Sequence, residues 1–371
     1  MACEPSVPVE LECVLSDDGH VVRAPRHAVP LDVRLELYRH MRRLRRLDAR
    51  LSALQRQGRI GFYGAALGQE AVPVAAALAA APDDWIFPAL REGAVLLVRG
   101  LPLVTYLAQL FGSARDPLKG RQMPNHVASR SVNVVSWSSC IGTQLPHAVG
   151  AALAAAKLGS NAVVLAFLGD GATSHPDFHA ALNFAGVFRA PVVFVCQNNQ
   201  YAISLPSTRQ TASSTFAEKA RAYGLTEARI DGNDAIAVYA GIADALDRAR
   251  GGGGATLIEC VTYRLGAHSS SDDPSLYRSA AEEASWRERD PIRRLGRHLE
   301  REGVGSAARD REIDAALDAE LERALAEVEQ DPRPALETLF DDVYARVPWH
   351  LVEQRAELRR VAGSRPEHRS V

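Results

Sequence analysis

The chain has 371 residues, of which 47% are hydrophobic, and its formal net charge at pH 7 is −2. This length is sufficient for one large α/β domain with an extension or for two smaller domains, and the apolar content excludes wholesale disorder. The nearly neutral charge argues against a general attraction to nucleic acid or to an acidic membrane.

Cysteine usage and the N-terminal pattern bear on the compartment. Five cysteines are scattered along the chain and form no Cys-x-x-Cys pair, which favours a reducing compartment over a zinc site or a disulfide framework. The N-terminus has no signal-peptide or transit-peptide pattern, and the Ala-rich stretches are too short to cross a bilayer. We therefore expect a cytoplasmic protein.

The N-terminal part of the chain is predicted to be mostly helical. Residues 1–30 contain several prolines and little periodicity, so we expect an irregular arm there. Residues 31–58 have the apolar spacing of a long amphipathic helix that carries many arginines. A glycine-rich turn follows, and then an Ala-rich helix from about 69 to 80.

The central part of the chain changes character. Residues 162–168, 191–196 and 256–263 are short continuous apolar runs, and the first two end in Gly-Asp-Gly and Gln-Asn-Asn. Helical patterns over 144–158 and 178–187 precede the first and second runs. Uninterrupted apolar strands that alternate with helices predict an α/β fold with a doubly wound parallel sheet, covered on both faces.

The C-terminal part is helical and strongly charged, with helices expected near 291–302, 310–329 and 334–345. We therefore divide the chain into an irregular arm (1–30), an α/β domain (31–280) and a helical extension (281–371). No internal repeat is evident.

The polar residues after the first two apolar runs are placed to meet. In a doubly wound sheet ligands bind outside the carboxyl ends of the strands, and one crossover helix puts both strand ends on the same edge. A carboxylate, an amide oxygen and a backbone carbonyl are ligands suited to Mg²⁺, and they leave positions open for phosphate oxygens. Gly169 and Gly171 let the backbone turn sharply beside Asp170. Residues from Ala172 can open the next helix, whose amides favour a phosphate.

The spacing of these two motifs resembles the signature of the thiamine diphosphate enzymes. Gly-Asp-Gly ends one apolar run, and after 26 residues (172–197) Asn-Asn ends the next. Over roughly residues 30–350 further segments resemble the α subunit of 2-oxo acid dehydrogenases. These are Gly-Arg-Gln-Met-Pro-Asn-His from 120, Ser-Ser-Cys-Ile-Gly-Thr-Gln from 138, Asn-Asn-Gln-Tyr-Ala-Ile-Ser from 198, Asp-Gly-Asn-Asp from 231, and 263–274. Gly-Arg-Gln-Met-Pro and His-Ser-Ser-Ser-Asp-Asp are closer to the branched-chain enzymes than to the pyruvate enzymes.

The resemblance implies a ligand set for Mg²⁺ and for thiamine diphosphate. The Asp170 and Asn199 side chains and the Tyr201 carbonyl would bind the metal, whereas Asn198 would be structural. The other residues implied to contact the cofactor are Arg91 at the diphosphate, the backbone of Ser139 and Ile141 at the aminopyrimidine, the turn Gly169, Gly171 and Ala172, and His268 as the active-site histidine. A monovalent cation such as K⁺ would be held by Ser138, Thr143 and Gln144.

Three positions depart from the family pattern. Leu90, preceded by Ala89, stands where the family usually has a tyrosine before the diphosphate arginine. Gln197 replaces a residue that is often basic in the branched-chain relatives, and Ala267 replaces a second histidine. The first two changes remove a hydroxyl group and a charge near the phosphates, so they make the pocket more apolar and put the cofactor affinity in question.

The activity implied is the oxidative decarboxylation of a 2-oxo acid, with transfer of the acyl group to a lipoyl arm on an acyltransferase core. Activation of the cofactor needs a carboxylate at the aminopyrimidine, normally from a separate pyrimidine-binding domain. One doubly wound unit is predicted here, and we interpret Glu70 as structural. The resemblance therefore implies a β subunit as partner, in a heterotetramer of two α and two β subunits.

Alternatives remain open from the sequence. The chain could be the α subunit of a pyruvate or acetoin dehydrogenase, or a cofactor-holding scaffold of little activity because Leu90 and Gln197 weaken the phosphate site. A nucleotide-binding Rossmann protein is disfavoured because no Gly-x-Gly-x-x-Gly follows a strand. The Ser- and Asp-rich loop 265–278 could become ordered on ligand binding or be an ordinary exposed loop.

Overall fold

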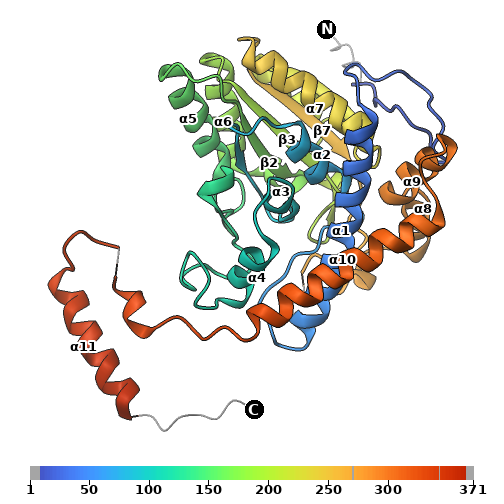
Figure 1. The fold of residues 1–371 in the computed structure, drawn as a ribbon. Coiled ribbons are helices and arrows are strands. Elements are labelled where there is room, and N and C mark those ends of the chain that lie inside the picture. Colours follow the sequence, from blue (N-terminus) through green and yellow to red (C-terminus); the bar gives the residue numbers. More distant parts are fainter. Residues whose placement is uncertain (1–8, 270, 342, 365–371) are drawn as a thin grey trace.

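The computed structural model describes residues 9–269, 271–341 and 343–364 and is built around one parallel sheet (Figure 1). The sheet has five strands in the order β1-β2-β3-β7-β6. Their bounds are Trp85–Phe87, Val164–Gly169, Val192–Asn198, Thr256–Val261 and Thr226–Asp231. Every residue of β3 is buried, as are all but the last of β2. This burial explains the uninterrupted apolar runs, and it confirms the predicted doubly wound parallel sheet.

Helices cover both faces of the sheet, because successive side chains of a strand point to opposite faces and are apolar on both. On one face Val164, Ala166 and Leu168 of β2 pack in a core cluster with α5 (Gln144–Lys157) and α6 (Pro176–Val187). On the other face Leu165 and Phe167 share a second cluster with α1, α2 and α7. These helices span Leu31–Arg56, Ala71–Ala79 and Ala235–Arg250. The two cores hold the carboxyl ends of β2 and β3 rigidly at one edge.

The remaining helices continue the chain around this core. They are α3 (Ala94–Val98), α4 (Leu103–Phe111), α8 (Ala280–Glu288), α9 (Pro291–Arg301), α10 (Ala307–Val328) and α11 (Trp349–Ser364). None of the helices in the described ranges is long and apolar enough to cross a membrane. In Figure 1 α11 lies away from the sheet, at the end of an extended segment that follows α10.

The expected helix over 334–345 is wrong. The structure has only a short 3-10 turn there, Leu336–Leu339, and the next helix is α11, whose first residue follows Pro348. The apolar side chains of Leu336, Leu339 and Val343 are about half exposed and Phe340 alone among the large apolar residues described in this segment is buried, so the segment has no continuous apolar face against the core. Most helical stability in proteins comes from packing an apolar face, which is missing here. Two strands are not predicted from the sequence: β1, which is three residues long, and β6, which carries charged side chains.

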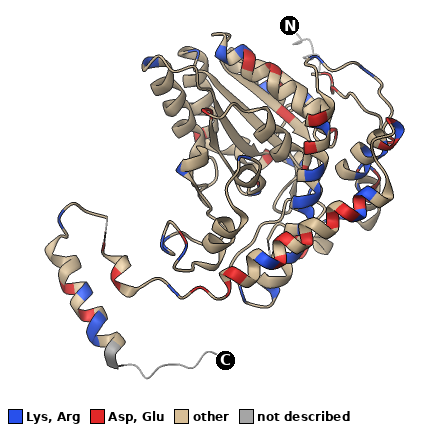
Figure 2. Ribbon diagram, viewed as in Figure 1, with Lys and Arg blue, Asp and Glu red and all other residues tan. Residues whose placement is uncertain are grey.

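A ladder of ion pairs joins α1 to α10, two helices 250 residues apart in sequence that lie side by side in Figure 1. Arg42 pairs with Asp314, Arg46 with Asp318 and Arg50 with Glu322, so each step of four residues on α1 meets a step of four on α10. Figure 2 shows these facing rows of basic and acidic residues. The arginines predicted on the first helix therefore fasten the C-terminal extension to the domain.

Arg42 is the least exposed arginine of these three, and it also donates to the Tyr38 hydroxyl at 2.7 Å. We expect Arg42→Ala to lower the free energy of unfolding by about 1–3 kcal/mol, because it removes the closest cationic partner of the partly buried Asp310 and Asp314 carboxylates. Arg50→Ala, at the exposed end of the ladder, is the control and should cost less than about 0.5 kcal/mol. Urea unfolding measures both changes in the free energy of unfolding. Equal losses in the two variants would contradict the larger contribution expected of Arg42.

Candidate active site

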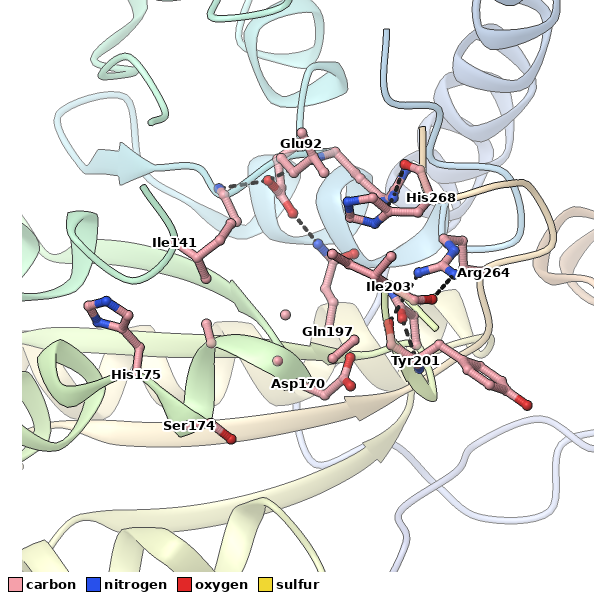
Figure 3. A pocket seen from close by; sticks show the side chains of 18 of the residues that line it. Glu92, Ile141, Asp170, Ser174, His175, Gln197, Tyr201, Ile203, Arg264 and His268 are labelled. Carbon is pink, nitrogen blue, oxygen red and sulfur yellow. Dashed lines mark hydrogen bonds between the residues drawn. The ribbon is translucent and has the colours of Figure 1, made fainter. Parts of the chain in front are cut away.

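A cavity of about 440 Å³ lies at the carboxyl ends of β2 and β3 (Figure 3). Its volume is typical of a site for a small molecule or cofactor. Of the residues predicted from the sequence, it brings together Arg91, Ser138, Ile141, Gln144, Gly169, Asp170, Gly171, Ala172, Asn199, Tyr201 and His268. Ser139 and Thr143 are not among its lining residues. Parallel register accounts for the convergence, since Gly169 lies opposite Gln197 on the neighbouring strand.

Asp170 presents a buried carboxylate to this cavity. The residue is 1% exposed, and its Oδ2 has no hydrogen-bond partner among the described residues. Burial raises the pKa of Asp170 to about 6. Thr173 and Gln210 both donate side-chain hydrogen bonds to its backbone carbonyl, at 2.8 and 2.6 Å, and so hold the turn. A buried carboxylate oxygen without a donor is costly by itself and suits a cation.

Two neutral oxygens come from the next strand end. Asn199 donates from Nδ2 to Oε1 of the fully buried Gln69 at 3.0 Å, so this contact orients the amide group. The Tyr201 carbonyl accepts a hydrogen bond from Arg264 at 3.1 Å and keeps a second lone pair. Asn198 turns away and donates to Glu259 at 2.7 Å. The donor set therefore consists of one carboxylate and hard neutral oxygens, which fits Mg²⁺.

This donor set contains one acidic side chain, that of Asp170. Within the described residues no group of three or more His, Cys, Asp and Glu side chains is placed to hold a metal ion. A magnesium site at Asp170 would depend on phosphate oxygens of a bound ligand to complete its shell. Metal and diphosphate binding would then be coupled.

Two buried arginines give the cavity a positive wall. Arg91 donates to the carbonyls of Ala65 at 2.5 Å and His268 at 2.7 Å, and burial lowers the pKa of its guanidinium to about 10. Arg264 is 1% exposed, and its hydrogen bonds go to two carbonyls and to the Tyr277 hydroxyl. Buried charges are normally paired, yet the hydrogen-bond partners shown for both are neutral. The cavity is thus suited to an anion.

Arg264 was not identified from the sequence as a site residue. Its only signal was its place in the segment 263–274, which was quoted for the resemblance without assigning this arginine a role. The structure puts it beside the Tyr201 carbonyl and in the wall of the cavity. It therefore links the candidate metal ligands to the loop that carries His268.

His268 lies against Arg91, with 3.4 Å between Nδ1 and Nη2. Burial, together with the nearby charges of Arg91 and Arg264, lowers the pKa of His268 to about 4. The imidazole is therefore uncharged at neutral pH and can donate or accept a hydrogen bond. Asp272 accepts from the His268 backbone N–H at 2.6 Å and from the Tyr277 hydroxyl at 2.6 Å. These bonds give loop 265–278, outside the undescribed residue 270, a defined path.

Glu92 and Gln197 form a pair in the cavity wall that the sequence did not reveal (Figure 3). The Glu92 carboxylate accepts from the backbone N–H groups of Ala89 at 2.7 Å and Arg91 at 3.1 Å. Its other oxygen accepts from Gln197 Nε2. Burial raises the pKa of Glu92. Gln197, which departs from the family pattern, thus helps hold the loop that carries Arg91. The same loop presents the apolar Ala89 and Leu90 to the cavity.

The helix predicted to open at Ala172 begins later. Residues Asp170–Ser174 form a 3-10 turn, and α6 starts at Pro176 with His175 as its cap. A proline ring disfavours the helical conformation for the residue before it, and His175 accordingly has an extended ψ of 140°. Amides of the turn, rather than those of a regular helix, therefore lie next to Asp170.

The residues predicted to hold a monovalent cation make local contacts. Thr143 donates to the Cys140 carbonyl at 2.8 Å, and Gln144 donates to the Phe167 carbonyl at 2.8 Å. Cys140 N donates to the Ser138 hydroxyl at 3.1 Å, and the Ser139 hydroxyl hydrogen-bonds to His126 at 2.9 Å. These contacts shape the loop before α5. The cation site stays a prediction.

Comparison with known proteins gives a consistent family. A model described as dehydrogenase E1 component matches residues 38–337. The chain is 41% identical over 356 residues to the mitochondrial 2-oxoisovalerate dehydrogenase subunit alpha 2 of Arabidopsis thaliana, covering 95% of this chain and 75% of the relative. It is 42% identical to the 2-oxoisovalerate dehydrogenase subunit alpha of Pseudomonas aeruginosa, over 93% of this chain and 86% of the relative. It is 38% identical to a pyruvate dehydrogenase E1 component subunit alpha of Staphylococcus aureus, over 93% and 91%.

The charge of Arg91 contributes to the low pKa of His268, so we expect Arg91→Met to move this pKa from about 4 toward the ordinary 6.5. The direction follows because a nearby positive charge disfavours the imidazolium ion. NMR of the histidine ring in a pH titration measures the shift. Arg189→Met, at an exposed arginine after α6, is the control. A His268 pKa that does not move in Arg91→Met would show that the charge of Arg91 does not contribute to it.

Glu92→Gln keeps the size of the side chain but replaces one of the two carboxylate oxygens by an NH₂ group, which cannot accept a hydrogen bond from a backbone N–H. We expect it to weaken the binding of thiamine diphosphate by about tenfold, because one or two hydrogen bonds that position Arg91 are lost. Calorimetric titration at saturating Mg²⁺ measures the affinity. The rate at saturating cofactor should change far less. Exposed Glu288→Gln is the control, and unchanged affinity in Glu92→Gln would exclude a positioning role.

Proposed function

The chain belongs to the dehydrogenase E1 component family, and from this premise we propose that its pocket binds magnesium thiamine diphosphate to decarboxylate a branched-chain 2-oxo acid. It is an α subunit of the 2-oxo acid dehydrogenase type, from a family that depends on thiamine diphosphate. The observation that carries the proposal is the buried, unpartnered Oδ2 of Asp170 beside two buried arginines. A metal-bridged diphosphate satisfies both.

Each side chain then has a defined task. Asp170, the Asn199 amide and the Tyr201 carbonyl would hold Mg²⁺, and Gln69 orients the amide. Arg91, kept in place by Glu92, would bind the diphosphate. When bound, thiamine diphosphate supplies a nucleophilic carbon and an electron sink. The uncharged His268 donates or accepts a hydrogen bond at the entrance for the substrate, and the backbone of Ser139 and Ile141 would contact the aminopyrimidine.

The proposed substrate has a branched aliphatic side chain. Two relatives at 41% and 42% identity are named as 2-oxoisovalerate dehydrogenase subunits, and the pyruvate dehydrogenase relative is 38% identical. Ala89, Leu90, Ile141 and Ile203 give the cavity an apolar wall. Such a wall favours a branched alkyl group and excludes water from the reacting carbon. Pyruvate is the second candidate because of that third relative.

The pocket also needs a second chain. Its acidic lining residues within the described ranges are Glu92 and Asp170, and both have tasks already described. Glu70 is fully buried and paired with Arg45 at 2.7 Å, which supports the structural role predicted for it. The carboxylate for the aminopyrimidine would therefore come from a β subunit, in a heterotetramer that passes the acyl group to a lipoyl-bearing acyltransferase core. A K⁺ site at Ser138, Thr143 and Gln144 is proposed from the loop's resemblance alone.

Asp170→Ala removes the carboxylate of the proposed metal site. We expect Mg²⁺-dependent binding of thiamine diphosphate to be lost in the complex with the β subunit, because no other carboxylate in the described wall is free to replace it. Calorimetry of the assembled complex measures this binding. Asp244→Ala, on the exposed face of α7, is the control. Unchanged cofactor affinity in Asp170→Ala would refute the metal assignment.

Substrate choice and the need for a partner are tested together. With an artificial electron acceptor, the chain mixed with its β subunit should turn over 3-methyl-2-oxobutanoate with a higher kcat/KM than pyruvate. The chain alone should show negligible turnover, since it lacks the activating carboxylate. A preference for pyruvate would move the assignment to the second candidate. Full activity without a β subunit would refute the shared active site.

A further inference from the structure

Asp48 is a buried carboxylate on α1 that has no place in the wall of the cavity. The residue is 3% exposed and is not among the residues that line the cavity. Both of its oxygens accept hydrogen bonds. Oδ1 accepts from the Tyr63 hydroxyl at 2.5 Å, and Oδ2 accepts from the backbone N–H of Ala66 at 2.7 Å. Asp48 therefore holds the irregular segment 63–66 at both of its ends.

Segment 63–66 lies directly beside the loop that carries Arg91. The carbonyl of Ala65, between the two residues that Asp48 holds, accepts a hydrogen bond from Arg91 Nη1 at 2.5 Å. A Cβ atom on Gly64 would lie 3.4 Å from the Leu90 side chain and 3.7 Å from Arg91 Nη1, so the two segments are close neighbours. The two hydrogen bonds of Asp48 thus fix the carbonyl group that orients the Arg91 guanidinium.

A second route leads from Asp48 to the other end of the same loop. Tyr63, the partner of Asp48, also has a side-chain interaction with the buried Tyr106 of α4. The Tyr106 hydroxyl is so close to Gly93 that a Cβ atom at this glycine would lie 2.4 Å from it. Gly93 follows Glu92, whose carboxylate accepts backbone N–H groups of the loop. Loop 89–93 is therefore bounded at both ends by groups that are connected to Asp48.

The charges of Asp48 and Arg91 also act on each other, although the Arg91 guanidinium donates to carbonyl groups. Burial raises the pKa of Asp48 to about 7, and the charge of Arg91 acts against this rise. Burial lowers the pKa of Arg91 to about 10, and the charge of Asp48 acts against this fall. Each group therefore favours the charged form of the other. A buried carboxylate is costly, and one beside a cofactor-sized cavity is a candidate for a functional role.

We propose that Asp48 is a positioning residue for cofactor binding, which acts through segment 63–66 to hold Arg91 in the orientation that binds the diphosphate. This inference rests on the proposed function, in which Arg91 is the diphosphate ligand. Asp48 acts through another residue, because it lies outside the cavity wall. Its loss should therefore weaken the binding of the cofactor far more than it slows an enzyme that is saturated with cofactor.

Two substitutions test this role in the complex with the β subunit. Asp48→Asn should weaken the binding of thiamine diphosphate at saturating Mg²⁺ by about tenfold, because the NH₂ group of Asn cannot accept one of the two hydrogen bonds. Tyr63→Phe should weaken it by about threefold, because the bond from Ala66 remains. Calorimetry measures both affinities, and turnover gives KM for the cofactor and kcat. Leu47→Ala is the matched control, since it removes a buried apolar side chain next to Asp48 and should leave the affinity unchanged.

Hydrogen exchange of the assembled complex, measured before any cofactor is added, follows the loop itself. In Asp48→Asn the backbone N–H groups of Ala66, Ala89 and Arg91 should exchange about tenfold faster, because segment 63–66 and loop 89–93 open more often. Leu47→Ala should not single out these N–H groups. Thermal unfolding of each variant checks its fold. If Asp48→Asn does not fold, Tyr63→Phe removes a single hydroxyl group and gives the same comparison.

The outcomes separate this role from the proposed function. If the unsubstituted complex binds thiamine diphosphate and both variants bind it equally well, the positioning role is overturned and the proposed function stands. Exchange at Ala89 and Arg91 that is unchanged in both variants, or a loss confined to kcat with KM for the cofactor unchanged, also overturns the role. Faster exchange in Asp48→Asn, next to an unsubstituted complex that does not bind thiamine diphosphate, supports the link from Asp48 to Arg91 and counts against the proposed function.

Discussion

Parallel pairing of β2 with β3 is the constraint on which the rest of the site depends. Gly169 lies opposite Gln197, so the chain leaves both strands at the same edge of the sheet. Two hydrophobic cores, one on each face, hold that edge in place. A slip of one residue would turn every side chain of a strand to the opposite face. The spacing of Asp170 from Asn199 therefore follows from buried strands rather than from contacts within the site.

Burial gives these positioned groups their chemistry. Burial raises the pKa of the Asp170 carboxylate to about 6. Burial and the nearby arginines lower the pKa of His268 to about 4, so its imidazole is uncharged at neutral pH. The arginines remain charged while bonded to neutral carbonyls, because no carboxylate hydrogen-bonds to Arg91 or Arg264 within the described residues. The site is thus suited to a cation at Asp170 and to an anion at the two arginines. The magnesium diphosphate proposed for this pocket would supply both with one ligand.

The helices on the two faces of the sheet differ in the charge of their outer sides. The helices α5 and α6 bury one side against the sheet and leave the other side apolar and exposed. The helices α1 and α10 instead cover the domain with paired charges that face water. The helices α5 and α6 carry one acidic or basic residue each besides histidine, whereas α1 and α10 carry many that pair across their contact. The contrast in charge between them is visible in Figure 2.

The sequence by itself determined the fold class, the family and the residues that follow β2 and β3. Those inferences depend on short spacings: continuous apolar runs, Gly-Asp-Gly, and Asn-Asn after one crossover helix. The family and the parallel sheet are confirmed, and the roles assigned to Asp170 and His268 stay predictions.

Only the tertiary structure decided the contacts between distant segments. Glu92 meets Gln197 across 105 positions, and Arg264 reaches the Tyr201 carbonyl across 63, so no local pattern could reveal either contact. The failed helix over 334–345 has the same origin, since its sequence has helical periodicity but most of its large apolar side chains stay exposed and only Phe340 among those described is buried. Periodicity reports what a segment can form, and packing decides what it does form.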